Sequence, residues 1–335
     1  MSIVMTGGGT GGHLAIIKAV KVHLGDEELI YIGSTQGQDR EWFEGDDDFD
    51  YTYFFETRGV VNQGALGKVK SLFMMFKATL KAIGLLRKHK AKVVFSVGGF
   101  SAAATAFAAK LLHIPLVIHE QNAALGSLNR LLKPYATDFI SSYLEESPIK
   151  AYPIKAIFFE KARVRDTIKT VIFLGGSQGA KAINTLALKM APALHLRGIK
   201  IIHQAGVNHI EKVKKAYNDL GIEAEVFDFT TELADYMQKA DFAIARSGAS
   251  TLWELSATAL PTLFIPYPYA ASDHQFHNAA FLVEKNLAWI MREDEIDTQK
   301  VLALLDENLS MKSQGLMKRV EKGGSEEIAT LLTQI

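Results

Sequence analysis

Four glycine-rich turns, each after a short apolar run, are the parts of this 335-residue chain whose pattern could do chemistry. The first ends in Thr10-Gly11-Gly12 and is followed at once by His13; the others begin at Gly98, Gly175 and Ser247. Glycines let backbone N–H groups approach an anion closely, and a helix after each turn adds the positive end of its dipole. Together the turns predict a phosphate-handling site, and His13 places a titratable group beside it.

The first turn, Gly7-Gly8-Gly9-Thr10-Gly11-Gly12, formally matches the dinucleotide fingerprint after a strand. That function needs an acid about 20 residues further on to hold a ribose hydroxyl. The second predicted strand ends without one, and the Gly-Lys-Ser/Thr of a P-loop is also absent. His13 is then either a solvent-exposed residue at a helix start or a general base, because a helix N-terminus favours the neutral imidazole that a base requires.

Two series of buried strands separated by helices must position these turns. The first series is expected at 3–6, 29–33, 93–97, 116–119 and 138–141, and the second at 171–174, 200–203, 225–227, 242–245, 262–265 and 288–291. Continuous apolar strands between helices predict α/β domains with doubly wound parallel sheets. A charged, proline-containing stretch at 145–165 separates domains 1–150 and 151–321. Since ligands bind at the carboxyl ends of such strands, we expect the site between the domains.

Composition excludes several classes of protein and site. The chain has no cysteine, which rules out disulfides and thiolate metal sites. No room precedes the first strand for a signal peptide, and no apolar run reaches the roughly 18 residues of a membrane span, so we expect a cytoplasmic chain. The acids of 41–50 predict a solvated loop. Residues 57–119 hold ten Lys or Arg and no acid, which indicates an anionic membrane or polyphosphate partner but no nucleic acid.

The segment from Leu66 to Lys90 combines both properties of that basic stretch. Its periodicity predicts one helix with an apolar stripe and, on the adjacent face, a line of lysines. The stripe is Val69, Leu72, Phe73, Phe76, Leu80 and Ile83, and the lysines are Lys70, Lys77, Lys81 and Lys88. Such a helix either packs its stripe in the core or lies in an anionic membrane interface, and the absence of acids favours the interface.

Five motifs keep one order along the chain and resemble the MurG family of bacterial peptidoglycan glycosyltransferases, glycosyltransferase family 28. They are Gly8–His13, His119-Glu120-Gln121-Asn122, Gly175–Ala180, Arg246–Ala249 before Glu254, and His274-Gln275 before Asn278-Ala279. The resemblance implies a GT-B fold, with two Rossmann-like domains facing a central cleft and the C-terminal helix 322–335 packed back on the first. It also implies inverting transfer of N-acetylglucosamine from UDP-GlcNAc to the muramoyl 4-hydroxyl of lipid I, forming lipid II.

The same resemblance assigns roles residue by residue. His13 is the expected base, Thr10, Gly11 and Gly12 should lie beside the donor sugar and pyrophosphate, and Asn122 should hold the transferred sugar. The expected contacts in the second domain are Ser177 to the diphosphate, Gln275 to the sugar, the Thr230 backbone to uracil, and Ala249, Ser250, Thr251, Leu252, Trp253 and Glu254 around the nucleotide, with Glu254 on the ribose. Lys155 stands where the family has arginine and keeps the charge without the bidentate fork.

No paired-aspartate motif follows a strand of the second domain, so we expect no tightly bound metal cofactor. The resemblance implies peripheral attachment to the cytoplasmic face of the bacterial inner membrane, and cell-wall synthesis and division proteins as partners. Three alternatives remain from the sequence: another GT-B glycosyltransferase acting on a glycolipid, a UDP-GlcNAc epimerase, and a non-catalytic nucleotide-sugar-binding scaffold of the wall machinery.

Overall fold

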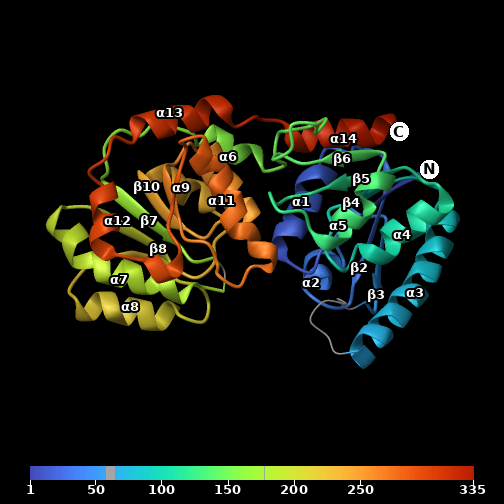
Figure 1. The fold of residues 1–335 in the computed structure, drawn as a ribbon, viewed down its shortest axis with the longest axis horizontal. Coiled ribbons are helices and arrows are strands. Elements are labelled where there is room, and N and C mark those ends of the chain that lie inside the picture. The colour runs from blue at the N-terminus through green and yellow to red at the C-terminus, as the bar shows by residue number, and fades with distance from the viewer. Residues whose placement is uncertain (58–64, 177) are drawn as a thin grey trace. The chain divides into compact units, whose positions relative to one another are not determined.

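The structure is a computed structural model that describes residues 1–57, 65–176 and 178–335 (Figure 1). The chain forms two compact units of parallel sheet covered by helices. Unit 1 comprises Met1–Ile154 and Gly323–Ile335, and unit 2 comprises Lys155–Lys322. The α/β class with two doubly wound parallel sheets, expected from the alternation of apolar runs and helices, is confirmed.

The described strands of unit 1 form a six-stranded parallel sheet in the order β3-β2-β1-β4-β5-β6. Its strands are β1 (Ser2–Thr6), β2 (Glu28–Ser34), β3 (Tyr51–Phe55), β4 (Ala91–Ser96), β5 (Leu116–His119) and β6 (Asp138–Ile140). Its helices are α1 (Gly11–Lys21), α2 (Asp39–Phe43), α3 (Ala65–Lys88), α4 (Ala103–Leu112), α5 (Ser127–Leu132) and α14 (Gly324–Gln334). The strand order reverses between β1 and β4, whose carboxyl ends carry the first two glycine turns.

Unit 2 repeats this plan, its described strands forming a six-stranded parallel sheet in the order β12-β11-β10-β7-β8-β9. The strands are β7 (Thr170–Leu174), β8 (Lys200–Gln204), β9 (Glu225–Phe227), β10 (Phe242–Ala245), β11 (Thr262–Phe264) and β12 (Trp289–Ile290). The helices are α6 (Ala156–Glu160), α7 (Lys181–Leu196), α8 (Ile210–Asp219), α9 (Leu233–Lys239), α10 (Ala249–Ala257), α11 (His274–Glu284), α12 (Thr298–Leu304) and α13 (Ser310–Arg319). Here β7 and β10 flank the reversal and carry the other two turns.

The core of unit 1 explains why the chain folds this way. Val4 of β1 pairs in register with Ile30 of β2 and Val94 of β4, and all three side chains are buried. Small residues such as Ala78 on α3 and Ala104 on α4 belong to the same core cluster, which lets the two helices approach closely. The C-terminal helix α14 contacts α1, and Lys92 of β4 donates to the Thr333 carbonyl at 3.2 Å.

Two details differ from the sequence prediction. Strand β3 was not expected, and it extends the sheet as the edge strand next to β2. Most of the acids before it are exposed, as expected of a solvated segment, but two of them also neutralise a buried group: the Nζ of Lys21 pairs with Asp46 and, at 2.9 Å, with Asp48. Asp50 in turn accepts from the Leu29 amide at 2.7 Å. These carboxylates neutralise a buried lysine and fasten the start of β2, so the segment is structural.

Candidate active site

His13 lies at the first turn of α1, with both ring nitrogens engaged. Its Nδ1 is 2.8 Å from the Oγ1 of Thr10, the residue preceding α1, and its Nε2 is 2.5 Å from the Nε2 of Gln121. In this orientation the Gln121 amide nitrogen is the donor, which makes the His13 Nε2 the acceptor and corresponds to a ring proton on Nδ1. This tautomer points the basic lone pair of His13 toward the turn that follows β5.

Glu120 shapes that turn. Its buried carboxylate accepts from the backbone amide of Asn122 at 3.0 Å, from the Gly126 amide at 2.9 Å and from the Asn129 side chain at 3.0 Å. These bonds fold residues 120–126 around one acid, which places Gln121 against His13 and leaves Asn122 partly exposed beside it. Glu120 and Gln121 belong to the motif that identified Asn122, but sequence reasoning gave them no role.

A second imidazole is buried beside His13. Neither ring nitrogen of His119, at the end of β5, has a hydrogen-bond partner within the described ranges. Burial and, to a lesser degree, the neighbouring His13 lower the pKa of His119 to about 3. His119 is therefore neutral at physiological pH and adds no positive charge next to the candidate base.

The carboxyl ends of β7, β10 and β11 in unit 2 surround a cavity of about 350 Å³. Its walls include Gly175, Gly179, Arg246, Tyr267, Gln275 and Glu293. The Arg246 guanidinium pairs with Glu293 and donates to the carbonyls of Ile265 and Pro266 at 3.0 Å. Gln275 accepts from the Tyr267 amide at 3.0 Å, which leaves its two N–H donors for a ligand. Of the cavity's side chains, only Gln275 was predicted; Arg246 stood in a quoted motif, and nothing in the sequence signalled Tyr267 or Glu293.

A buried polar network supports the glycine turn at this cavity. A Cβ on Gly206 would lie 2.1 Å from the Gly179 nitrogen, so the two backbones meet without room for side chains. Asn184 of α7 donates to the Ala205 carbonyl at 3.0 Å, and its Oδ1 lies 3.0 Å from the Nε2 of His203. Burial lowers the pKa of His203 to about 3, so a neutral imidazole completes the network.

Glu254 and Lys155 are brought together by the contact between α10 and α6. Burial raises the pKa of Glu254 to about 7, although the positive charge of Lys155 opposes the shift. A carboxyl that titrates near neutrality, here within the helix that follows β10, is typical of functional sites. Glu254 thus has the environment of a ligand-binding acid, and Lys155 tunes it.

The other predicted residues of unit 2 differ in how accessible they are to a ligand. Ala249, Ser250 and Thr251 form the first turn of α10, where backbone N–H groups are open to a ligand. Leu252 is fully buried and Trp253 packs against Phe281, so these two offer a ligand no side chain. Thr230 lies after β9 and accepts from the Glu232 amide at 3.0 Å. Ser177 lies outside the described residues.

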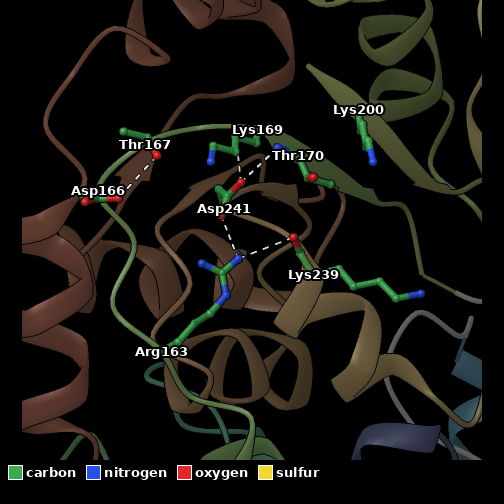
Figure 2. A pocket seen from close by; sticks show the side chains of 8 residues that line it. All are labelled: Arg163, Asp166, Thr167, Lys169, Thr170, Lys200, Lys239 and Asp241. Atoms are coloured by element: carbon green, nitrogen blue, oxygen red, sulfur yellow. Dashed lines mark hydrogen bonds and ion pairs between the residues drawn. The ribbon is translucent and has the colours of Figure 1, made fainter. Parts of the chain in front are cut away.

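A larger cavity of about 460 Å³ lies at the opposite, amino end of the same sheet (Figure 2). There the Asp241 carboxylate binds Arg163 at 2.7 Å and accepts from the backbone amides of Lys169 and Thr170 at 2.8 and 3.0 Å. These bonds fasten the entry of β7 to β10. Because ligands of such sheets bind at carboxyl ends, we assign this cavity a structural origin. Over the ranges the structure describes, His, Asp and Glu side chains form no cluster able to hold a metal ion.

Comparison with known proteins decides the family. The model of the glycosyltransferase family 28 N-terminal domain matches residues 3–141, and that of the family 28 C-terminal domain matches residues 170–332. The chain belongs to glycosyltransferase family 28. A family member from Sulfurovum sp., a UDP-N-acetylglucosamine--N-acetylmuramyl-(pentapeptide) pyrophosphoryl-undecaprenol N-acetylglucosamine transferase, is 75% identical over 99% of this chain and 98% of its own.

Two further family 28 proteins agree. The transferase of the same name from Sulfurimonas denitrificans is 54% identical over 98% of both chains. The crystal structure of Acinetobacter baumannii MurG superimposes with a TM-score of 0.84 at 26% identity, covering 100% of this chain and 99% of that one. The GT-B fold and the resemblance to the MurG family are therefore confirmed, and the chain is a glycosyltransferase.

Proposed function

We propose that this chain transfers N-acetylglucosamine from UDP-GlcNAc to the muramoyl 4-hydroxyl of lipid I, which yields lipid II and UDP. The observation that carries the proposal is the full-length 75% identity to a transferase of that name. The geometry of the site supports it, because unit 1 offers an imidazole held by two side chains, and unit 2 offers a glycine-lined cavity and a buried acid with a raised pKa.

His13 acts as the base. Its Nε2 lone pair takes the proton of the acceptor hydroxyl in place of the Gln121 amide, while the hydroxyl oxygen attacks C1 of the donor sugar. The bond from C1 to the UDP oxygen breaks on the opposite face, so the anomeric centre inverts. Thr10 keeps the ring proton of His13 on Nδ1 throughout and accepts from the imidazolium that forms.

The donor is held by unit 2. Glu254 accepts hydrogen bonds from the ribose hydroxyls, Gln275 donates to the sugar, and the glycine turn from Gly175 with the first turn of α10 faces the diphosphate. Backbone N–H groups and helix dipoles neutralise the leaving diphosphate in place of a resident metal. Turnover should therefore survive exhaustive EDTA treatment; a loss of turnover that Mg²⁺ restores would show that the diphosphate needs a cation.

Helix α3 brings unit 1 to the membrane that carries the lipid acceptor. The apolar stripe of α3 does not pack in the core at four of its residues: Leu72, Phe73, Phe76 and Leu80 are 53–60% exposed. The core is contacted instead by the face that carries Ala78, Ala82 and Leu86. Exposed lysines flank the apolar surface, and the Lys77 ammonium lies 4.5 Å from the Phe73 ring. No helix among the described residues is long and apolar enough to span a bilayer.

Vesicle binding tests this membrane proposal. Binding to anionic vesicles should fall with added salt and with the double variant Lys77→Glu, Lys81→Glu, because both weaken attraction to the surface. The charge-matched control is Lys212→Glu, Lys214→Glu on the exposed face of α8. Equal loss in both double variants, or binding that salt leaves unchanged, would contradict the proposal.

A UDP-release assay tests the transferase itself. UDP should form only when UDP-GlcNAc and a lipid I analogue are both present. Binding of UDP-GlcNAc without release of UDP would instead support a non-catalytic scaffold. Release with a diacylglycerol acceptor but not with the lipid I analogue would support a different glycolipid transferase.

A further inference from the structure

The carboxylate of Asp39, at the start of α2, holds the glycine turn that leads to His13. Asp39 is fully buried. Its Oδ1 accepts from the Gly9 amide at 2.6 Å, and its Oδ2 accepts from the Ser34 amide at 2.9 Å. One side chain thus joins the turn after β1 to the end of β2. Its contact in the turn, Gly9, lies four residues before His13.

The backbone of the turn lies directly on this carboxylate. A Cβ on Gly8 would come within 2.4 Å of the Asp39 Oδ1, so the contact leaves no space for a side chain. The hydroxyl of Tyr31 donates to the Gly7 carbonyl at 2.9 Å. Burial and the adjacent Asp39 raise the pKa of Tyr31, so this hydroxyl keeps its proton. The side chains of Asp39 and Tyr31 therefore hold the backbone of three consecutive glycines, Gly7 to Gly9.

These bonds use up the amides that an anion would need. The Gly9 N–H is taken by Asp39, and the Gly8 N–H points to the Gly98 carbonyl at 3.4 Å. A phosphate at this point of the turn would also face the negative charge of Asp39. The groups left to a ligand begin at Thr10.

We propose that Asp39 is a positioning residue that fixes the turn so that Thr10 and His13 meet the acceptor hydroxyl, and that Gly8 and Gly9 bind no pyrophosphate. This inference rests on the proposed transferase function. It limits any pyrophosphate contact of this turn to the groups from Thr10 onward.

Steady-state kinetics of Asp39→Asn test both halves of the proposal. Asparagine keeps the shape but accepts at only one oxygen, so one of the two amides loses its partner. We expect kcat to fall about 10- to 100-fold, since small misplacements of a catalytic group have effects of that size. The KM values for UDP-GlcNAc and a lipid I analogue should stay within about two-fold of wild type, because the variant misplaces the reacting group and leaves the groups that bind the substrates in place.

Asp50→Asn is the matched control, because Asp50 also accepts from a backbone amide of unit 1 but at the start of β2. Its kcat should equal that of wild type. Hydrogen exchange of the peptide covering Gly9 to His13 should quicken in Asp39→Asn and not in Asp50→Asn.

Three results would overturn the inference. They are an unchanged kcat in Asp39→Asn, a kcat loss of the same size in Asp50→Asn, and a lower KM for the lipid I analogue, which would mean that removing the carboxylate helped the turn bind a pyrophosphate. Wild type without turnover would instead refute the proposed function. Should Asp39→Asn not fold, Tyr31→Phe removes only the hydroxyl that holds Gly7; a wild-type kcat in that variant would equally refute positioning from below the turn.

Discussion

Replacing Glu254 with glutamine should remove a pH dependence from donor binding. Burial raises the pKa of Glu254 to about 7, and ribose hydroxyls donate best to its ionised form. In wild type the carboxyl must therefore lose a proton before it binds the donor fully, and below pH 7 that form becomes scarce. Glutamine stays neutral across the range and retains one acceptor oxygen.

The size of the effect follows from that pKa. The ionised fraction falls about 30-fold between pH 8 and pH 5.5 for a group with a pKa of about 7. The affinity of wild type for UDP-GlcNAc should fall by up to the same factor, about 2 kcal/mol of binding free energy. Glu254→Gln should bind more weakly than wild type at pH 8, by about 1–3 kcal/mol, and change little toward pH 5.5.

Isothermal titration calorimetry with UDP-GlcNAc, without acceptor, measures this directly. UDP-GlcNAc is the better probe than UDP because its pyrophosphate diester does not titrate in this range. Lys155→Met provides an internal check: losing the cation that lowers the pKa of Glu254 should move the midpoint above pH 7. A pH-independent affinity in wild type, or the same slope in Glu254→Gln, would refute the reasoning.

Three further variants test the supports of the site. The pKa of His203 is lowered from 6.5 to about 3, so its contribution to folding stability is complete above pH 6.5 and declines as the pH falls below that value. In urea denaturation, lowering the pH from above 6.5 to 5 should therefore cost wild type about 2 kcal/mol of unfolding free energy that His203→Gln does not lose. The buried Arg165 guanidinium donates hydrogen bonds to four backbone carbonyls, those of Met237, Arg163 and Ala240 at 2.7–3.1 Å and that of Thr258. In urea denaturation, Arg165→Met should therefore lower the free energy of unfolding by about 3 kcal/mol or more. A loss under about 1 kcal/mol would contradict this role. Gln121→Glu should hold a proton on the His13 Nε2, lower kcat at pH 7 about 10- to 100-fold and move the acid limb of the pH–rate profile upward, whereas an unchanged profile would exclude the contact.

Most of the sheet order was within reach of the sequence because buried parallel strands are continuous apolar runs. The strands at Leu116–His119, Glu225–Phe227 and Phe242–Ala245 have the predicted bounds. Strand β3 was missed because its Tyr51–Phe55 run follows a dense group of acids that indicated a loop. Two of these acids, Asp46 and Asp48, are partners of Lys21, a long-range pairing that no local pattern encodes.

The site shows the same division. Glycine turns and ordered motifs locate His13, Asn122 and Glu254, because local spacing sets the backbone there. The partners that tune them come from elsewhere in the chain: Gln121 is 108 residues from His13, and Asp39 is 30 residues from Gly9. Such contacts depend on which strands become neighbours, so they emerge only from the folded structure.

The most direct test of the central claim is product analysis with a lipid I analogue and UDP-GlcNAc. Wild type should form one β-linked N-acetylglucosaminyl product per UDP released, identified by mass spectrometry and NMR. His13→Ala should bind UDP-GlcNAc with wild-type affinity and form product at less than about 1% of the wild-type rate. UDP release without a glycosylated acceptor, or wild-type turnover by His13→Ala, would contradict the account.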